Sequence, residues 1–129
     1  MAAPLPFDIV YSRDGEVLRA HVTGVNGTLE TTLAYWQALA EEVRRQRPGA
    51  LLVVDDMEGD PPPPEQLVQF VRAMVGQGFE GVRVAYVERH AQQIPEVEFA
   101  EIVARDLGFD ARVFGNEAAA ALWLRHGAR

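Results

Sequence analysis

The sequence predicts an α/β domain in the order β-β-α-β-α-β-α-β-α, with a five-stranded, mostly parallel sheet whose first strand is antiparallel. Three observations indicate this class. Alternating apolar residues flank Asp14-Gly15, a pair that favours a tight hairpin turn. The run Ala50 to Val54 is wholly apolar, as in a strand buried on both faces. Segments with apolar residues every three or four positions, which is the helical spacing, alternate with the later strands.

The composition limits the function classes. With 129 residues the chain can bury a real core, and we predict a single domain over residues 1–129. The 12 basic residues, all arginine, face 19 acidic ones, and the net charge of −7 disfavours nucleic acid and anionic membranes as partners. Cysteine is absent, which excludes disulfides and zinc–thiolate sites. The chain start does not resemble a signal peptide, and no apolar run is long enough to span a membrane, so the expected location is the cytoplasm.

The first half of the chain predicts a hairpin, a helix and a buried strand. Residues 7–11 and 18–23 alternate between apolar and polar side chains, as strands with one buried face do. Thr28 is suited to cap a helix that continues to Pro48-Gly49, where proline and glycine end it. Ala50 to Asp55 then form the third strand.

The second half predicts two further helix–strand pairs and a last helix. Pro64 is acceptable in the first turn of a helix that reaches Val75, and residues 82–87 alternate as a strand. Pro95 can open the next helix, and Gly108 is placed to close it in a left-handed conformation. Residues 111–114 form a short strand, and Asn116 is the expected cap of the final helix.

The connecting helices have a consequence for the faces of the sheet. If successive strands lie side by side, right-handed crossovers put their helices on the same face and leave the opposite face less covered. Arg19, His21, Arg83 and Arg112 interrupt their strands at positions that face away from the core residues. They therefore predict either a polar, basic sheet face or ordinary surface and edge positions.

An acidic segment at the end of the third strand is the predicted binding site. Carboxyl ends of parallel strands are where α/β proteins place their sites. We expect this segment to bind a protein partner, and the run of prolines before Glu65 to stiffen it. Carboxylates can hold hard cations, but the spacing matches no calcium-binding loop, so neither a metal nor a cofactor is predicted. The predicted site residues are Asp55, Asp56, Met57, Glu58, Gly59, Asp60 and Glu65.

His90 is the candidate for acid–base chemistry. It follows the fourth strand at the same edge as Asp55, so a pair with Asp55 or Asp56 is geometrically possible. The alternative is a solvated loop histidine. Ser12 has no base at a suitable spacing, and no phosphate-binding glycine motif opens a helix. We therefore predict a non-enzymatic domain without catalytic residues, and keep a weak hydrolase or isomerase centred on His90 and Asp55 as an alternative.

The chain resembles the STAS domain, the fold of anti-sigma factor antagonists. The hairpin-first order and the apolar strand that ends in acids support this, and so does the closing segment Val113-Phe114-Gly115-Asn116-Glu117 followed by Ala121-Leu122-Trp123-Leu124. It is similar in particular to a bacterial group of STAS-like single-domain proteins whose last helix reads A-x-x-W-L after an R-V-F strand. The CRAL-TRIO lipid-transfer domains share this βα superhelical fold.

The resemblance implies a regulatory, protein-interaction function, with one departure. In anti-sigma factor antagonists the loop after the third strand carries a serine that a partner kinase phosphorylates. Here no serine or threonine follows Thr32, so the acids either mimic the phosphorylated state or are ordinary solvated turn residues. An alternative function is the binding of a small hydrophobic molecule or lipid in a cavity lined by Val68, Phe70, Val87 and Phe99. The exposed edge of the first strand could also pair in a homodimer.

Overall fold

The computed structural model describes residues 6–126 of the 129. Residues 1–5 and 127–129, which belong to the predicted single domain and include the chain start, lie outside the described part. The elements follow the predicted order, with an added 3-10 turn, η1. Their bounds are β1 Phe7–Asp14, β2 Val17–Val25, α1 Leu29–Gln46, β3 Ala50–Glu58, α2 Pro64–Ala73, β4 Arg83–Glu88, η1 Ala91–Gln93, α3 Ile94–Asp106, β5 Ala111–Phe114 and α4 Glu117–His126.

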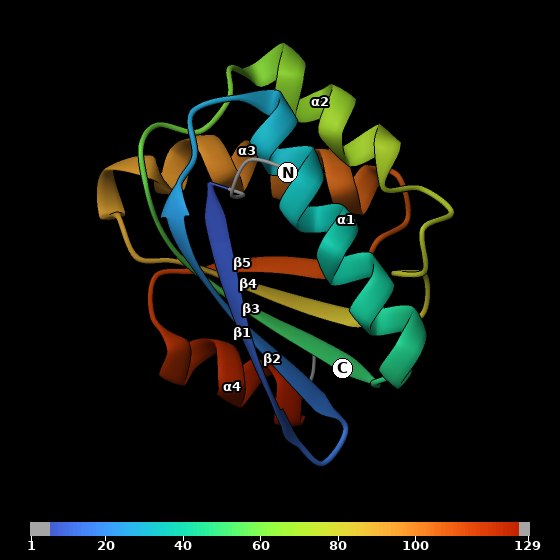
Figure 1. The fold of residues 1–129 in the computed structure, drawn as a ribbon. Coiled ribbons are helices and arrows are strands. Elements are labelled where there is room, and N and C mark those ends of the chain that lie inside the picture. The colour runs from blue at the N-terminus through green and yellow to red at the C-terminus, as the bar shows by residue number, and fades with distance from the viewer. Residues whose placement is uncertain (1–5, 127–129) are drawn as a thin grey trace, which may run out of the picture.

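The strands form one five-stranded sheet in the order β1-β2-β3-β4-β5. β1 is antiparallel to β2, and the remaining pairs are parallel. Helices α1, α2 and α3 cover one face, here called the inner face, whereas α4 lies against the opposite, outer face (Figure 1). The predicted fold class is therefore confirmed.

The outer face is covered more than the sequence indicated. Ala120 and Leu124 of α4 are buried in a second core cluster with the outward side chains of β3 and β4. The handedness of crossovers applies to helices that connect two parallel strands, and α4 is the last element of the described residues 6–126. The apolar side of α4 packs on the outer face against Leu52, Val54, Ala85 and Val87.

The inner core is built around aromatic rings. Trp36 of α1 lies with its ring centroid 5.5 Å from that of Phe70 and 5.7 Å from that of Phe79. It also stacks on Tyr86 of β4 at 6.1 Å. Burying side chains of this size stabilises a fold by about 1.5–3 kcal/mol each. The predicted helical stripes thus meet the sheet as expected.

The local signals in the sequence have the expected structural roles. Thr28 caps α1, because its hydroxyl oxygen accepts a hydrogen bond from the Thr31 amide at 3.1 Å. Asn116 Oδ1 accepts one from the Ala119 amide at 2.8 Å, at the start of α4. Gly108 has the positive φ of 96° that a residue closing α3 needs. These three predictions are confirmed.

Candidate functional site

The acidic segment is strand rather than loop over its first half. β3 does not end at Asp55 but continues to Glu58, because Asp56, Met57 and Glu58 stay in register with Thr23 to Val25 of β2. Side chains of a strand alternate between faces. Asp55 and Met57 are therefore buried on the inner face, with 6% and 3% exposure, whereas Asp56 and Glu58 are exposed. Asp55 and Met57 therefore face the interior, and a binding role for the whole predicted segment stays a prediction.

The exposed carboxylates form a surface that we call the acidic edge: Asp56, Glu58, Asp60 and Glu65. Asp56 Oδ2 lies 3.3 Å from His21 Nε2, and Glu58 Oε2 lies 3.9 Å from His90 Nε2. Within residues 6–126, Asp60 and Glu65 take part in no ion pair. The same residues contain no group of three or more His, Cys, Asp or Glu placed to hold a metal ion.

The turn after β3 is fixed by contacts on two sides. The amide of Asn26 donates to the Glu58 carbonyl at 2.8 Å, and Gln93 Nε2 donates to the Gly59 carbonyl at 2.6 Å. Gly59 has φ of 102°, and a Cβ there would lie 1.8 Å from the Asn26 carbonyl oxygen. Pro61 to Pro64 further restrict the backbone. The turn is therefore tied to the segment after β2 and to η1.

Beneath the acidic edge lies a buried pair of acids. Asp55 and Glu88 are register partners on β3 and β4, and Glu88 is only 2% exposed. Asp55 Oδ1 accepts a hydrogen bond from the Met57 amide at 2.9 Å, and Oδ2 accepts one from the Tyr86 hydroxyl. Burial raises the pKa of both carboxyl groups; the charge of Asp55 adds to the rise at Glu88, and the charge of Asp56 adds to the rise at Asp55.

Sequence reasoning missed Glu88 and Tyr86. Burial raises the pKa of Tyr86 well above its ordinary value, so this hydroxyl stays a neutral donor. The signal was present, since Val84, Tyr86 and Glu88 alternate along β4 and so share a face. The alternation within β4 does not predict how β4 pairs with β3, and it is this register that places Glu88 beside Asp55.

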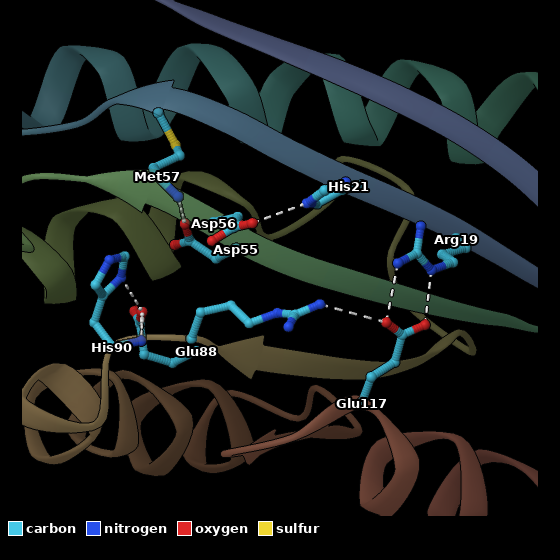
Figure 2. Close-up of polar contacts among 9 residues, drawn as sticks. Arg19, His21, Asp55, Asp56, Met57, Glu88, His90 and Glu117 are labelled. Carbon is cyan, nitrogen blue, oxygen red and sulfur yellow. Dashed lines mark hydrogen bonds and ion pairs between the residues drawn. The ribbon is translucent and has the colours of Figure 1, made fainter.

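His90 pairs with a different acid from the one expected. Its Nδ1 lies 3.3 Å from Glu88 Oε2, and its amide donates to the same oxygen at 3.0 Å (Figure 2). No hydrogen bond or ion pair in the described chain joins His90 to Asp55 or Asp56. The expected pair is therefore not formed, because the short link after β4 turns the imidazole back onto Glu88. The weak-enzyme alternative required that pair.

The polar strand residues predicted to face away from the core do lie on the outer face, but most of them contact an acid or an aromatic ring. They are Arg19, His21, Arg83 and Arg112. Arg19 makes two hydrogen bonds to Glu117 of α4, at 2.7 and 2.9 Å, and Figure 2 shows Glu117 reaching it from the helix start. The Arg83 guanidinium lies 4.2 Å from the centroid of Trp123 and pairs with Asp110. Arg112 lies 5.9 Å over Phe114. The outer face is therefore largely neutralised rather than a free basic surface.

A cavity of about 120 Å³ lies between the inner face and helices α1 to α3. Of the lining expected from sequence, Phe70 contributes, but Val68, Val87 and Phe99 do not. Val87 belongs to the outer cluster under α4, because residue 87 has the opposite parity from Tyr86 and Glu88. We call this space the inner cavity.

Two other expectations concern the surface. In the part of the chain that the structure describes, no helix is both long and apolar enough to cross a membrane. β1 forms one edge of the sheet, and Val10 on it is 59% exposed. Pairing of this edge in a homodimer stays a prediction.

Comparison with known proteins identifies the fold. No family model matches the sequence, and no curated protein matches it either. Among solved structures, the chain is similar to an anti-sigma factor antagonist from Mycobacterium paratuberculosis, with a TM-score of 0.54 and 14% identity. The match covers 97% of this chain and 99% of that one. The STAS-like fold that the sequence indicated is therefore confirmed.

Proposed function

We propose that this chain, which has a STAS-like fold, is a non-enzymatic regulatory domain that binds a protein partner through the acidic edge. The observation that carries the proposal is a group of exposed carboxylates at the end of β3 and in the fixed turn that follows it. Asp56 and Glu58 have 43% and 79% of their side-chain surface exposed, and the backbone of Glu58 and Gly59 is bonded to two other segments. Preordered groups lose little entropy when a partner binds.

Charge supports a basic partner. The net charge is −7, and Asp60 and Glu65 form no ion pair within residues 6–126. Complementary charge speeds association and favours the correct partner. The similar solved structure is named for antagonism of an anti-sigma factor, which is itself a protein, and this agrees with a protein ligand.

The proposed interaction needs no phosphorylation at this edge. The chain has no serine or threonine after Thr32, so the acidic edge offers no hydroxyl to a kinase. Its carboxylates carry permanent charge close to the start of α2, where a phosphorylated serine is placed by the STAS resemblance. Negative charge at a helix N-terminus is favoured by the helix dipole. We infer that the acidic edge is always charged and that the domain is always competent to bind its partner.

The test compares the wild type with the double variant Asp56→Ala, Glu58→Ala. Each immobilised protein is exposed to a lysate of the source cells, and retained proteins are identified by mass spectrometry. We expect the wild type to retain a protein that the variant does not. The melting temperature should change little, because exposed ion pairs stabilise a fold by only about 0–1 kcal/mol.

The matched control removes the same charge from the far end of the helices. Glu41→Ala with Asp106→Ala changes one Glu and one Asp at exposed positions of α1 and α3. This control should retain the same protein as the wild type. Retention of the same proteins by all three chains contradicts the proposed role of the acidic edge.

A further inference from the structure

The inner cavity has the size of a small ligand. Its volume is about 120 Å³, and it lies under α1, α2 and α3. An apolar protein cavity of about 150 Å³ holds benzene. The inner cavity therefore suits a molecule of about one six-membered ring. Its lining includes the aromatic side chains Tyr35, Trp36, Phe70, Phe79 and Tyr86.

The cavity reaches the surface at the acidic edge. Gly59 and Asp60, both exposed, contribute to its lining, together with Pro61. Tyr86 lines the cavity and is only half-buried. A ligand could therefore enter between the turn after β3 and the start of α3, where Gln93 also lines the cavity.

One end of the cavity carries two carboxyl groups. Asp55 and Glu88 both line it and both are at least nine-tenths buried. Glu88 Oε2 accepts a hydrogen bond from the His90 amide and lies 3.3 Å from Nδ1 of the imidazole, and no hydrogen bond in the described chain reaches Oε1. Glu88 therefore has an open acceptor position in a cavity that is otherwise mainly apolar.

We propose that the inner cavity binds a small primary amine, whose apolar body lies among the aromatic rings and whose ammonium group is held by Glu88 and Asp55. An ammonium group supplies the missing donors and compensates the negative charge of two neighbouring buried acids. Aromatic faces also attract cations. This ligand site goes beyond the proposed partner binding and does not depend on it.

The first experiment titrates the wild-type protein with probes of one shape and different charge. Benzylamine, benzyl alcohol, toluene and benzoate are compared by isothermal titration calorimetry. We expect benzylamine to bind with a Kd of about 1 mM or tighter, which is reasonable for about eight heavy atoms. Benzyl alcohol should bind at least about tenfold more weakly, because hydrogen bonds to charged groups are the stronger ones. Benzoate should not bind.

The two tryptophans locate the binding. Trp36 lines the inner cavity, whereas Trp123 packs on the outer face with Phe114. Benzylamine should shift the indole N–H resonance of Trp36 in an NMR spectrum and leave that of Trp123 unchanged. The Asp56→Ala, Glu58→Ala variant should still bind benzylamine, with affinity lowered by no more than about fivefold, which separates this site from the acidic edge.

Two variants test the chemistry of the site. Glu88→Gln keeps the shape but removes the charge, and should weaken benzylamine binding about tenfold or more while leaving toluene unaffected. Ala100→Leu fills the cavity from α3 and should abolish binding of both probes. Equal affinity for benzylamine and benzyl alcohol, no binding of benzylamine, or an unmoved Trp36 resonance each overturns the proposal. These outcomes need only the wild-type chain, so a variant that fails to fold does not remove the test.

Discussion

At the scale of single residues, Glu88 is unusual because it is a buried acid whose main partner is a histidine two positions away. It is 2% exposed, and His90 lies on its Oε2. Burial raises its pKa, so the folded protein holds this proton to higher pH than the unfolded chain does. The stability that the group contributes is complete below the ordinary glutamate pKa of 4.5 and is lost as the pH rises through its folded value.

This predicts how Glu88→Gln affects stability. At pH 7 the variant should melt at a higher temperature than the wild type, because the glutamine does not place a charge in the interior. Below pH 4.5 the difference should disappear, since the wild-type carboxyl group is then protonated in both states. Thermal melts between pH 4 and pH 8, followed by circular dichroism, measure this.

Glu80→Gln provides a control of opposite sign. Hydrogen bonds from backbone amides, first from Gly76, lower the pKa of Glu80, so its stabilisation is present at neutral pH and lost as the pH falls. That variant should melt at a lower temperature than the wild type at pH 7. If Glu88→Gln also melts lower at pH 7, the pairing with His90 outweighs the cost of burial.

At the scale of elements, the turn after β3 is hydrogen-bonded both to the residue that follows β2 and to the residue that precedes α3. Gly59 is the central residue, because its φ is 102° and its missing Cβ would collide with the Asn26 carbonyl. The left-handed conformation alone costs other residues of order 1–3 kcal/mol. At Gly59 the backbone must also move, which breaks the bond from Asn26 to Glu58 or that from Gln93.

We therefore predict that Gly59→Ala destabilises the fold by about 2 kcal/mol or more. It should also weaken partner capture, since the acidic edge shifts. Gly76→Ala is the matched comparison: its φ is 80°, but a Cβ there meets nothing within 4 Å. That variant has the strain without the collision and should cost about 1 kcal/mol. Urea denaturation measures both, and equal losses would show that the Asn26 contact contributes nothing.

The elements also show what the sequence could and could not predict. The Asp14-Gly15 hairpin signal, the Thr28 cap and the apolar run of β3 are local signals, and each structure follows from residues a few positions apart, although the turn itself is Gly15-Glu16 because Asp14 pairs with Val17. The extension of β3 to Glu58 depends on pairing with Val25 of β2, which lies far away in sequence. Local reasoning therefore placed Asp55 on the surface, whereas the register puts it inside.

At the scale of the whole molecule, the helices on the two faces of the sheet are positioned by different interactions. The crossovers place α1 to α3 on the inner face, and α4 closes the outer face through Leu124 and the bond from Arg19 to Glu117 (Figure 1). The sequence contains the arginine and the acid but does not show that they meet, because 98 positions separate them along the chain. The inner cavity could not be predicted either, since it results from how three helices pack on the sheet.

The same arrangement places the inner cavity directly beneath the acidic edge. Gly59, Asp60 and Pro61 line the cavity and also form the turn of the proposed partner site. A cation held by Glu88 would lower the negative potential that attracts a basic partner. Two ligands that bind coupled sites change each other's affinity by the same factor. Amine and partner should therefore oppose each other.

The expected result is that saturating benzylamine weakens binding of the captured partner by on the order of fivefold. Surface plasmon resonance with the immobilised domain measures the partner's Kd with and without benzylamine, and calorimetry measures the reciprocal effect on benzylamine. Benzyl alcohol should have a smaller effect because it carries no charge. Glu88→Gln should remove the coupling while partner binding itself persists, since Glu88 is buried and does not belong to the acidic edge. An unchanged partner Kd in saturating benzylamine would mean that the two sites act independently, each remaining testable alone.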